Sequence, residues 1–87
     1  MEYHTYILKS LADGRLYVGS TLDTERRLKE HNQGKVAATR NRRPLEIIHK
    51  ESYPTQLGAY RRERYLKSGI GREEIRKILG SSPAAKH

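Results

Sequence analysis

The sequence contains no cysteine, tryptophan or phenylalanine, and its 10 acidic residues are outnumbered by 18 lysines and arginines. Without cysteine the chain can form neither a disulfide nor a thiolate-bound metal site, which excludes a zinc finger. It also lacks an apolar run of about 18 residues and the apolar core of a signal peptide. These absences favour a cytoplasmic protein that does not cross a membrane.

The chain is short and strongly basic. Its 87 residues suit one domain, which at this size buries about 60 to 65% of its unfolded surface and favours a shallow surface site. We expect this domain at residues 1–80, followed by a flexible C-terminal tail at residues 81–87. The net charge of +8 favours a polyanionic partner, first of all nucleic acid. Because anionic-lipid binders and ribosomal-type proteins share this composition, the motifs must separate these classes.

The spacing of strand-favouring residues predicts three strands, at residues 3–10, 16–20 and 45–51. Between the first two, Asp13 and Gly14 predict a tight hairpin, which would pair Tyr6 with Thr21. A register shift of two residues preserves the face on which a side chain lies. Tyr6 and Tyr17 should therefore share one face of the sheet even if the turn is looser.

Start and stop signals predict three helices, and a basic loop at residues 35–43 follows the first of them. Asp23 is the expected N-cap of the first helix and Gly69 the expected stop of the second. The order strand, strand, helix, strand, helix, helix indicates an α/β (α+β) fold in which about three helices surround a three-stranded antiparallel sheet. The predicted helices are Asp23 or Thr24 to Gln33, Pro54 to Ser68, and residues 71–79.

A small set of side chains could form a site at Gly19, which permits a close approach of the backbone. Arg27 and His31 are four residues apart on the first helix and so project from one face. If Tyr17 lies beside them, a phenol, a guanidinium and an imidazole meet. Such a set suits an anion whose charge grows during reaction, as in the hydrolysis of a phosphodiester.

Glu63 interrupts the apolar stripe that Ala59 and Leu66 make on the second helix. A carboxylate on such a face needs a partner, which is either one of the many arginines or a metal ion. The basic loop likewise has two interpretations, as a solvated segment or as a surface for phosphates.

Taken in order, these residues resemble the GIY-YIG nuclease family, in particular its small stand-alone bacterial members, which are related to the N-terminal nuclease module of excision repair and to homing endonucleases. The resemblance covers about residues 3–68. Tyr17-Val18-Gly19 corresponds to the YIG element, and Tyr6 takes the place of the tyrosine that ends the GIY element. Three further positions match the family's helix arginine, a position often occupied by Tyr or His, and the metal-binding glutamate; these are Arg27, His31 and Glu63.

The sequence departs from the family pattern at two points. The first motif reads His4-Thr5-Tyr6, without the expected Gly and Ile. The asparagine that larger members carry after the glutamate helix has no clear counterpart, although Ser68 lies in that area. The resemblance therefore supports the fold more directly than the activity.

The resemblance implies a metal-dependent endonuclease that hydrolyses DNA phosphodiester bonds with one Mg²⁺ or Mn²⁺ ion, with repair or recombination intermediates as candidate substrates. Glu63 would hold the metal, and either Tyr17 or Tyr6 would orient and deprotonate the attacking water. The implied catalytic residues are Tyr6, Tyr17, Arg27, His31 and Glu63, and we expect them to line one concave face. For phosphate binding we expect the basic loop residues Lys35, Arg40, Arg42 and Arg43.

Two other functions remain open at this point. A non-enzymatic nucleic-acid-binding protein could keep the fold while the altered first motif has cost it catalysis. A structural or interaction module is a third reading, but it would not require the five candidate residues to converge. Family members normally take specificity from an attached DNA-binding domain, so a partner protein is an expected source of specificity here.

Overall fold

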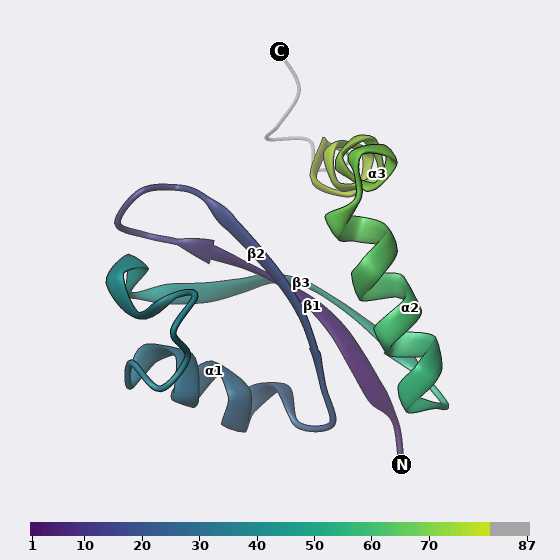
Figure 1. Ribbon diagram of the computed structural model, residues 1–87, viewed down its shortest axis with the longest axis horizontal. Helices are drawn as coiled ribbons and strands as arrows, with labels where there is room; N and C mark the ends of the chain where they lie inside the picture. Colours follow the sequence, from purple (N-terminus) through teal and green to yellow (C-terminus); the bar gives the residue numbers. More distant parts are fainter. Residues whose placement is uncertain (81–87) are drawn as a thin grey trace.

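The computed structural model describes residues 1–80, and the predicted tail at residues 81–87 lies outside the described residues. Within residues 1–80 the chain forms three strands and three helices, with a short 3₁₀ turn at Arg40–Arg42. The predicted α+β fold is confirmed (Figure 1). The strands are β1 (Tyr3–Ser10), β2 (Leu16–Thr21) and β3 (Leu45–Tyr53), and the helices are α1 (Thr24–Asn32), α2 (Gln56–Lys67) and α3 (Gly69–Gly80).

The sheet has the order β2-β1-β3, with β1 antiparallel to both neighbours. Helix α1 lies on one side of this sheet, and α2 and α3 lie on the other (Figure 1). Apolar side chains fill both interfaces because residues along a strand point alternately to the two faces. Tyr6, Leu8 and Leu45 pack with Leu28 on the α1 side. On the other side the packed residues are Ile7, Val18, Leu66, Ile75 and Ile78.

The pairing of β1 with β2 differs from the predicted register by two residues. Tyr6 lies opposite Gly19, not opposite Thr21. The reason is a longer turn over residues 11–15, in which the Ser10 hydroxyl accepts hydrogen bonds from the backbone amides of Ala12 and Asp13. Because the shift is even, Tyr6 and Tyr17 still share a face, as the sequence predicted.

The helices begin at side-chain caps. Asp23 accepts a hydrogen bond from the amide of Arg26 at the start of α1, and Thr55 caps α2 in the same way through Gly58. The second helix ends at Lys67, one residue before the predicted end, but Ser68 is its C-cap and Gly69 already belongs to α3. Among the described residues, no helix is both long and apolar enough to span a membrane.

A polar cluster joins β3 to α2 and α3. The Glu51 carboxylate accepts hydrogen bonds from Arg62 (2.8 and 3.1 Å) and from the hydroxyl of Tyr53 (2.6 Å), and it lies 2.8 Å from a ring nitrogen of His49. Arg62 also contacts Glu74 at 3.1 Å. Burial alone would raise the pKa of Glu51, but the hydrogen bonds from Arg62, Tyr53 and His49 outweigh it and lower the pKa to about 2.

This cluster makes stability depend on pH. Since the folded pKa of Glu51 lies below its ordinary value of 4.5, its stabilisation is present above pH 4.5 and is lost as the pH falls toward 2. Glu51→Gln should lower the free energy of unfolding by about 2 kcal/mol at pH 7, and by progressively less below pH 4.5. Urea unfolding at several pH values measures this, with the exposed Glu46→Gln as control. A deficit that does not change between pH 7 and pH 3 would contradict the assignment.

Candidate active site

The site forms where β2 carries no side chain at Gly19. A Cβ atom at this position would lie 2.5 Å from the Tyr6 hydroxyl and 3.2 Å from the Tyr17 ring. Real Cβ atoms do not make contacts as short as the first, so only glycine lets the Tyr6 ring lie across the neighbouring strand. The absence of a side chain thereby brings the two phenols together on the α1 face of the sheet.

His31 completes a buried chain of polar groups on this face. Its imidazole is 0% exposed, with one ring nitrogen 3.1 Å from the Tyr6 hydroxyl and the other 2.8 Å from the Thr39 hydroxyl. The imidazole also meets the rings of Tyr6 and Tyr17 edge to face, at centroid distances of 6.0 and 5.1 Å. Sequence reasoning missed Thr39, because its contact depends on the path of the loop after α1.

Burial keeps both partners of this hydrogen bond neutral. Burial and the charge of Arg27 lower the pKa of His31 to about 4. Burial also raises the pKa of Tyr6 to about 12, although Arg27 opposes the shift. At neutral pH the Tyr6 hydroxyl therefore meets an uncharged imidazole, which has one nitrogen to donate and one to accept.

Arg27 lies at the partly exposed rim of the same face. Its Nη1 donates a 2.8 Å hydrogen bond to Glu30 on the next turn of α1. This hydrogen bond is the main cause that raises the pKa of Arg27, and the nearby Tyr6 adds to it. The structure thus brings four of the five predicted residues together on the α1 face, namely Tyr6, Tyr17, Arg27 and His31.

Glu63 belongs to α2 and so lies on the opposite side of the sheet. Its Oε1 accepts a 2.7 Å hydrogen bond from the hydroxyl of Ser20, the residue that follows Gly19. Its Oε2 pairs with the Lys67 ammonium at 2.6 Å, and that ammonium lies 5.4 Å from the centroid of the Tyr17 ring. Glu63 therefore approaches the tyrosines around β2, which is an edge strand of the sheet. Its ion-pair partner is a lysine, where an arginine was the expected alternative to a metal.

Glu63 is the residue that could hold a metal here. Among residues 1–80 no group of three or more His, Cys, Asp or Glu side chains is arranged to hold a metal ion. One carboxylate is enough for Mg²⁺, which binds proteins through one or two carboxylates and fills its other positions with water and phosphate. The Glu63 side chain is 15% exposed, and both of its oxygens already have protein partners, Ser20 and Lys67.

The four predicted loop cations divide into two pairs. Arg42 lies 3.4 Å from an Asp13 carboxylate oxygen and 3.4 Å from the carbonyl oxygen of Leu16, and Arg43 donates to the carbonyl of Arg40 at 2.8 Å. Both guanidinium groups thus support the loop itself. Lys35 and Arg40 are exposed.

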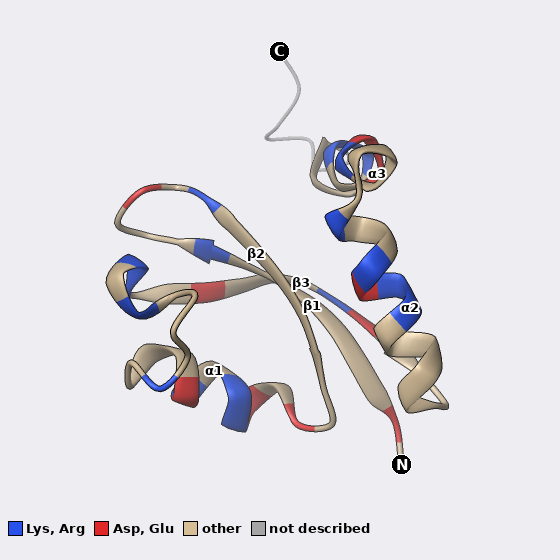
Figure 2. Cartoon of the chain, viewed as in Figure 1, with Lys and Arg blue, Asp and Glu red and all other residues tan. Residues whose placement is uncertain are grey.

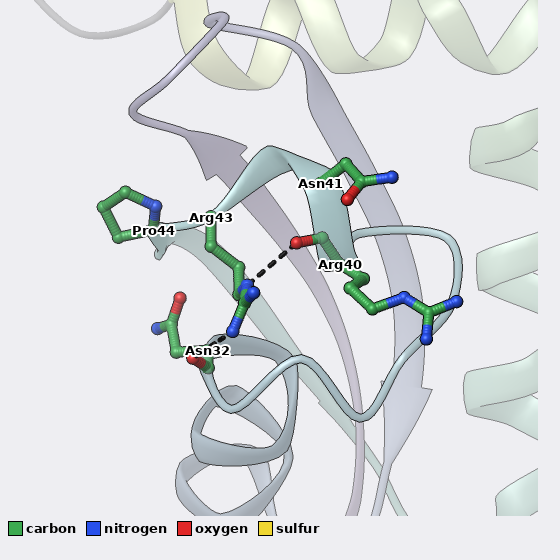
Figure 3. Close-up of a pocket in the computed structure, with 5 residues that line it drawn as sticks. All are labelled: Asn32, Arg40, Asn41, Arg43 and Pro44. Carbon is green, nitrogen blue, oxygen red and sulfur yellow. Dashed lines mark hydrogen bonds between the residues drawn. The ribbon is translucent and has the colours of Figure 1, made fainter.

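Arg43 and Arg40 line an open pocket of about 500 Å³ together with Asn32, Asn41 and Pro44 (Figure 3). In this view the Arg40 side chain points away from the Arg43 guanidinium. Figure 2 shows that further Lys and Arg residues lie along α1 and α2. Acidic residues lie among them on both helices, so the loop is one of several places where cations gather.

Comparison with known proteins finds a family model and several relatives that match most of this chain. Residues 2–74 match the family model described as the GIY-YIG catalytic domain. A UPF0213 protein of Haloquadratum walsbyi is 41% identical over 68 residues, which cover 77% of this chain and 76% of that protein. A UPF0213 protein of Staphylococcus epidermidis is 34% identical over 79 residues, covering 90% and 96%.

One solved structure is similar to this chain over most of the length of both chains. The solution NMR structure of a UPF0213 protein from Bacillus halodurans is 33% identical in sequence and has a TM-score of 0.57. The match covers 98% of this chain and 92% of that chain. The names of these three relatives state no activity.

Proposed function

This chain belongs to the GIY-YIG family of nucleases, and from that premise we propose that it is a metal-dependent endonuclease that hydrolyses DNA phosphodiester bonds. The observation that carries the proposal is the convergence of Tyr6, Tyr17 and His31 at Gly19, with Arg27 beside them. Repair or recombination intermediates are the proposed substrates, with a partner protein as a source of specificity. Nothing in this set of residues reads a base sequence.

Tyr17 is the better candidate to orient and deprotonate the attacking water. Tyr6 is 2% exposed, is hydrogen-bonded to His31 and has a pKa of about 12, so water reaches it poorly and its proton is hard to remove at neutral pH. Tyr17 is only partly buried and lies on the edge strand. Tyr6 and the neutral His31 then act as positioning residues that hold the Tyr17 ring and α1 in place.

Arg27 is proposed to contact the phosphate that is cleaved. Its guanidinium is partly exposed and can offer a charge-assisted hydrogen bond to a phosphate oxygen. Glu30 now holds one of its nitrogens, which fixes the direction of the side chain but leaves other N–H groups for substrate.

Glu63 is proposed to hold one Mg²⁺ or Mn²⁺ ion. The Ser20 hydroxyl fixes the direction of the carboxylate, since it donates to Oε1 and leaves Oε2 facing the partly exposed Lys67. A bound ion would supply a Lewis acid that stabilises the leaving oxygen. Glu63 lies beside β2, so the ion would act across this edge strand from Tyr17.

A non-enzymatic nucleic-acid-binding protein is the second candidate, and the altered first motif favours it. The two substituted positions are built into the fold: the buried Thr5 hydroxyl donates to the carbonyl of Ala59 on α2 at 2.7 Å, and His4 contacts Ser52 at 3.0 Å. The next residue, Tyr6, keeps its hydroxyl against His31. Both candidates keep this fold, so the cleavage assay is the test that separates them.

The catalytic proposal is tested by single-turnover cleavage of a panel of labelled DNA structures with Mg²⁺ or Mn²⁺. Glu63→Ala should abolish cleavage while DNA affinity, measured without metal, stays equal or rises, because a negative charge is removed. Tyr17→Phe should slow cleavage by ~10²-fold or more, the usual scale for general acid–base catalysis. Arg27→Ala should weaken binding and cleavage together.

Two exposed residues provide matched controls for this experiment. Tyr60→Phe and Glu46→Ala make the same chemical changes outside the site and should leave cleavage unchanged. Equal cleavage by wild type and Glu63→Ala would refute the metal assignment. Binding without cleavage of any substrate in the panel would establish the second candidate.

The basic loop generates a separate prediction about DNA binding. If Lys35 and Arg40 each contact a phosphate of duplex DNA, replacing both by Ala should reduce the slope of log affinity against log salt by about 1.8, at about 0.9 per contact. Their exposure means that stability should not change. Arg42→Ala should instead lower stability by about 1 kcal/mol, because its contacts with Asp13 and the Leu16 carbonyl are lost.

Fluorescence anisotropy titrations at several salt concentrations measure the slope. The double variant Lys50→Ala/Lys77→Ala removes the same charge elsewhere on the protein and serves as control. The loop has no part in binding if the Lys35→Ala/Arg40→Ala protein keeps the wild-type slope.

A further inference from the structure

Both carboxylate oxygens of Glu63 are engaged, but by partners of different kinds. Ser20 offers a neutral hydroxyl at 2.7 Å, and Lys67 offers a full positive charge at 2.6 Å. Lys67 therefore occupies the side of the carboxylate on which a cation would bind. The proposed metal and this ammonium cannot both take Oε2 at close range, because two cations so placed repel one another.

We propose that Lys67 is an internal counter-cation that holds Glu63 in the metal-free protein and must leave it before a divalent ion binds. This inference rests on the proposed function, since it takes Glu63 as the metal ligand. Lys67 then sets how strongly the free protein binds metal. In this role it is a positioning residue, because it acts through Glu63.

The surroundings of Lys67 allow this exchange. The Lys67 side chain is 44% exposed while that of Glu63 is 15% exposed, so the lysine can swing into solvent and leave the carboxylate in place. The two residues are four apart on α2, and such partly exposed pairs stabilise a protein only weakly. Ser20, on the edge strand, would continue to hold Oε1 during the exchange.

The released ammonium has a ready new partner in the substrate. Its present position, 5.4 Å from the Tyr17 ring centroid, is next to the residue proposed to activate water. Lys67 also lines a groove of about 440 Å³ that combines an apolar floor with two further cations, Arg72 and Arg76; the apolar lining residues are Leu16, Val18, Leu66 and Ile75. A DNA phosphate entering there attracts Lys67 away from Glu63, and a metal ion on Glu63 frees Lys67 for the phosphate. Metal and DNA therefore strengthen each other's binding, and this coupling is reciprocal.

The test measures Mn²⁺ binding to the 87-residue chain without DNA, by electron paramagnetic resonance of the free ion. Lys67→Met should bind Mn²⁺ about fivefold more tightly than wild type, since an exposed ion pair of this kind competes by up to about that factor. Lys67→Arg keeps the charge and should stay within about twofold of wild type. Lys77→Met removes a lysine from α3 and controls for the change in net charge, so it should bind as wild type does.

Glu63→Gln separates this inference from the proposed function. If Glu63→Gln loses Mn²⁺ binding but Lys67→Met binds no more tightly than wild type, the role of Lys67 is refuted and the metal site stands. If Glu63→Gln binds Mn²⁺ as well as wild type does, or if neither wild type nor Lys67→Met binds it, both the metal assignment and the role of Lys67 fail. Circular dichroism of each variant checks that it is folded.

A second measurement addresses the coupling. Ca²⁺ should raise the affinity of the wild-type protein for a DNA duplex by a larger factor than it raises that of Lys67→Met, because only wild type has an ammonium to transfer from carboxylate to phosphate. The same factor in both proteins would refute the coupling.

Discussion

The hydrogen bond between Tyr6 and His31 is the interaction on which both the fold and the site depend. Helix α1 is almost entirely polar, and its one apolar residue, Leu28, packs against the sheet in the α1-side core. Polar contacts hold the helix as well: the Asn32 amide makes two hydrogen bonds with the backbone of Leu45, and the fully buried imidazole meets a phenol from β1 and the hydroxyl of Thr39. That contact exists because Gly19 leaves room for the Tyr6 ring. In a chain of 87 residues, the same side chains therefore serve as core and as site.

The candidate site extends around an edge strand. Side chains of β2 point alternately to the two faces, so Tyr17 lies with α1 while Ser20 lies with α2. Residues on opposite sides of the sheet can meet a common substrate only where the sheet ends, and β2 is such an edge. Lys67 connects the two sides, since it pairs with Glu63 and lies over the ring of Tyr17. A phosphodiester lying along this edge could reach both.

Much of this arrangement follows from local rules. Alternation along strands placed Tyr6 and Tyr17 on one face, and helical periodicity placed Arg27 and His31 together. The predicted register of β1 and β2 was wrong by two residues, but the same side chains share a face in both registers because the shift is even. The capping residue Asp23 and the buried stripe of Ala59 and Leu66 were likewise evident from their types and spacing.

Other features depend on tertiary contacts that periodicity does not encode. The spacing on α2 indicates which side of the helix carries Glu63, but not which face of the sheet that helix covers. Thr39 meets His31 only through the path of the intervening loop. Arg42 resembled a free phosphate-binding cation in the sequence, yet it lies against Asp13 across a turn that proved longer than expected. The contact of Glu63 with Ser20 is tertiary in the same way, whereas its pair with Lys67 follows the i, i+4 spacing of a helix and was within reach of sequence reasoning.

Glu63 is proposed to bring a metal ion to the edge of β2, beside the tyrosine pair. The most direct test is paramagnetic broadening by substoichiometric Mn²⁺ in the amide spectrum of the ¹⁵N-labelled protein. The amide signals of Gly19, Ser20 and Glu63 should broaden first, and Glu63→Gln should remove the effect. Broadening that is strongest around Glu30 on the α1 face, or that persists in Glu63→Gln, would contradict the account.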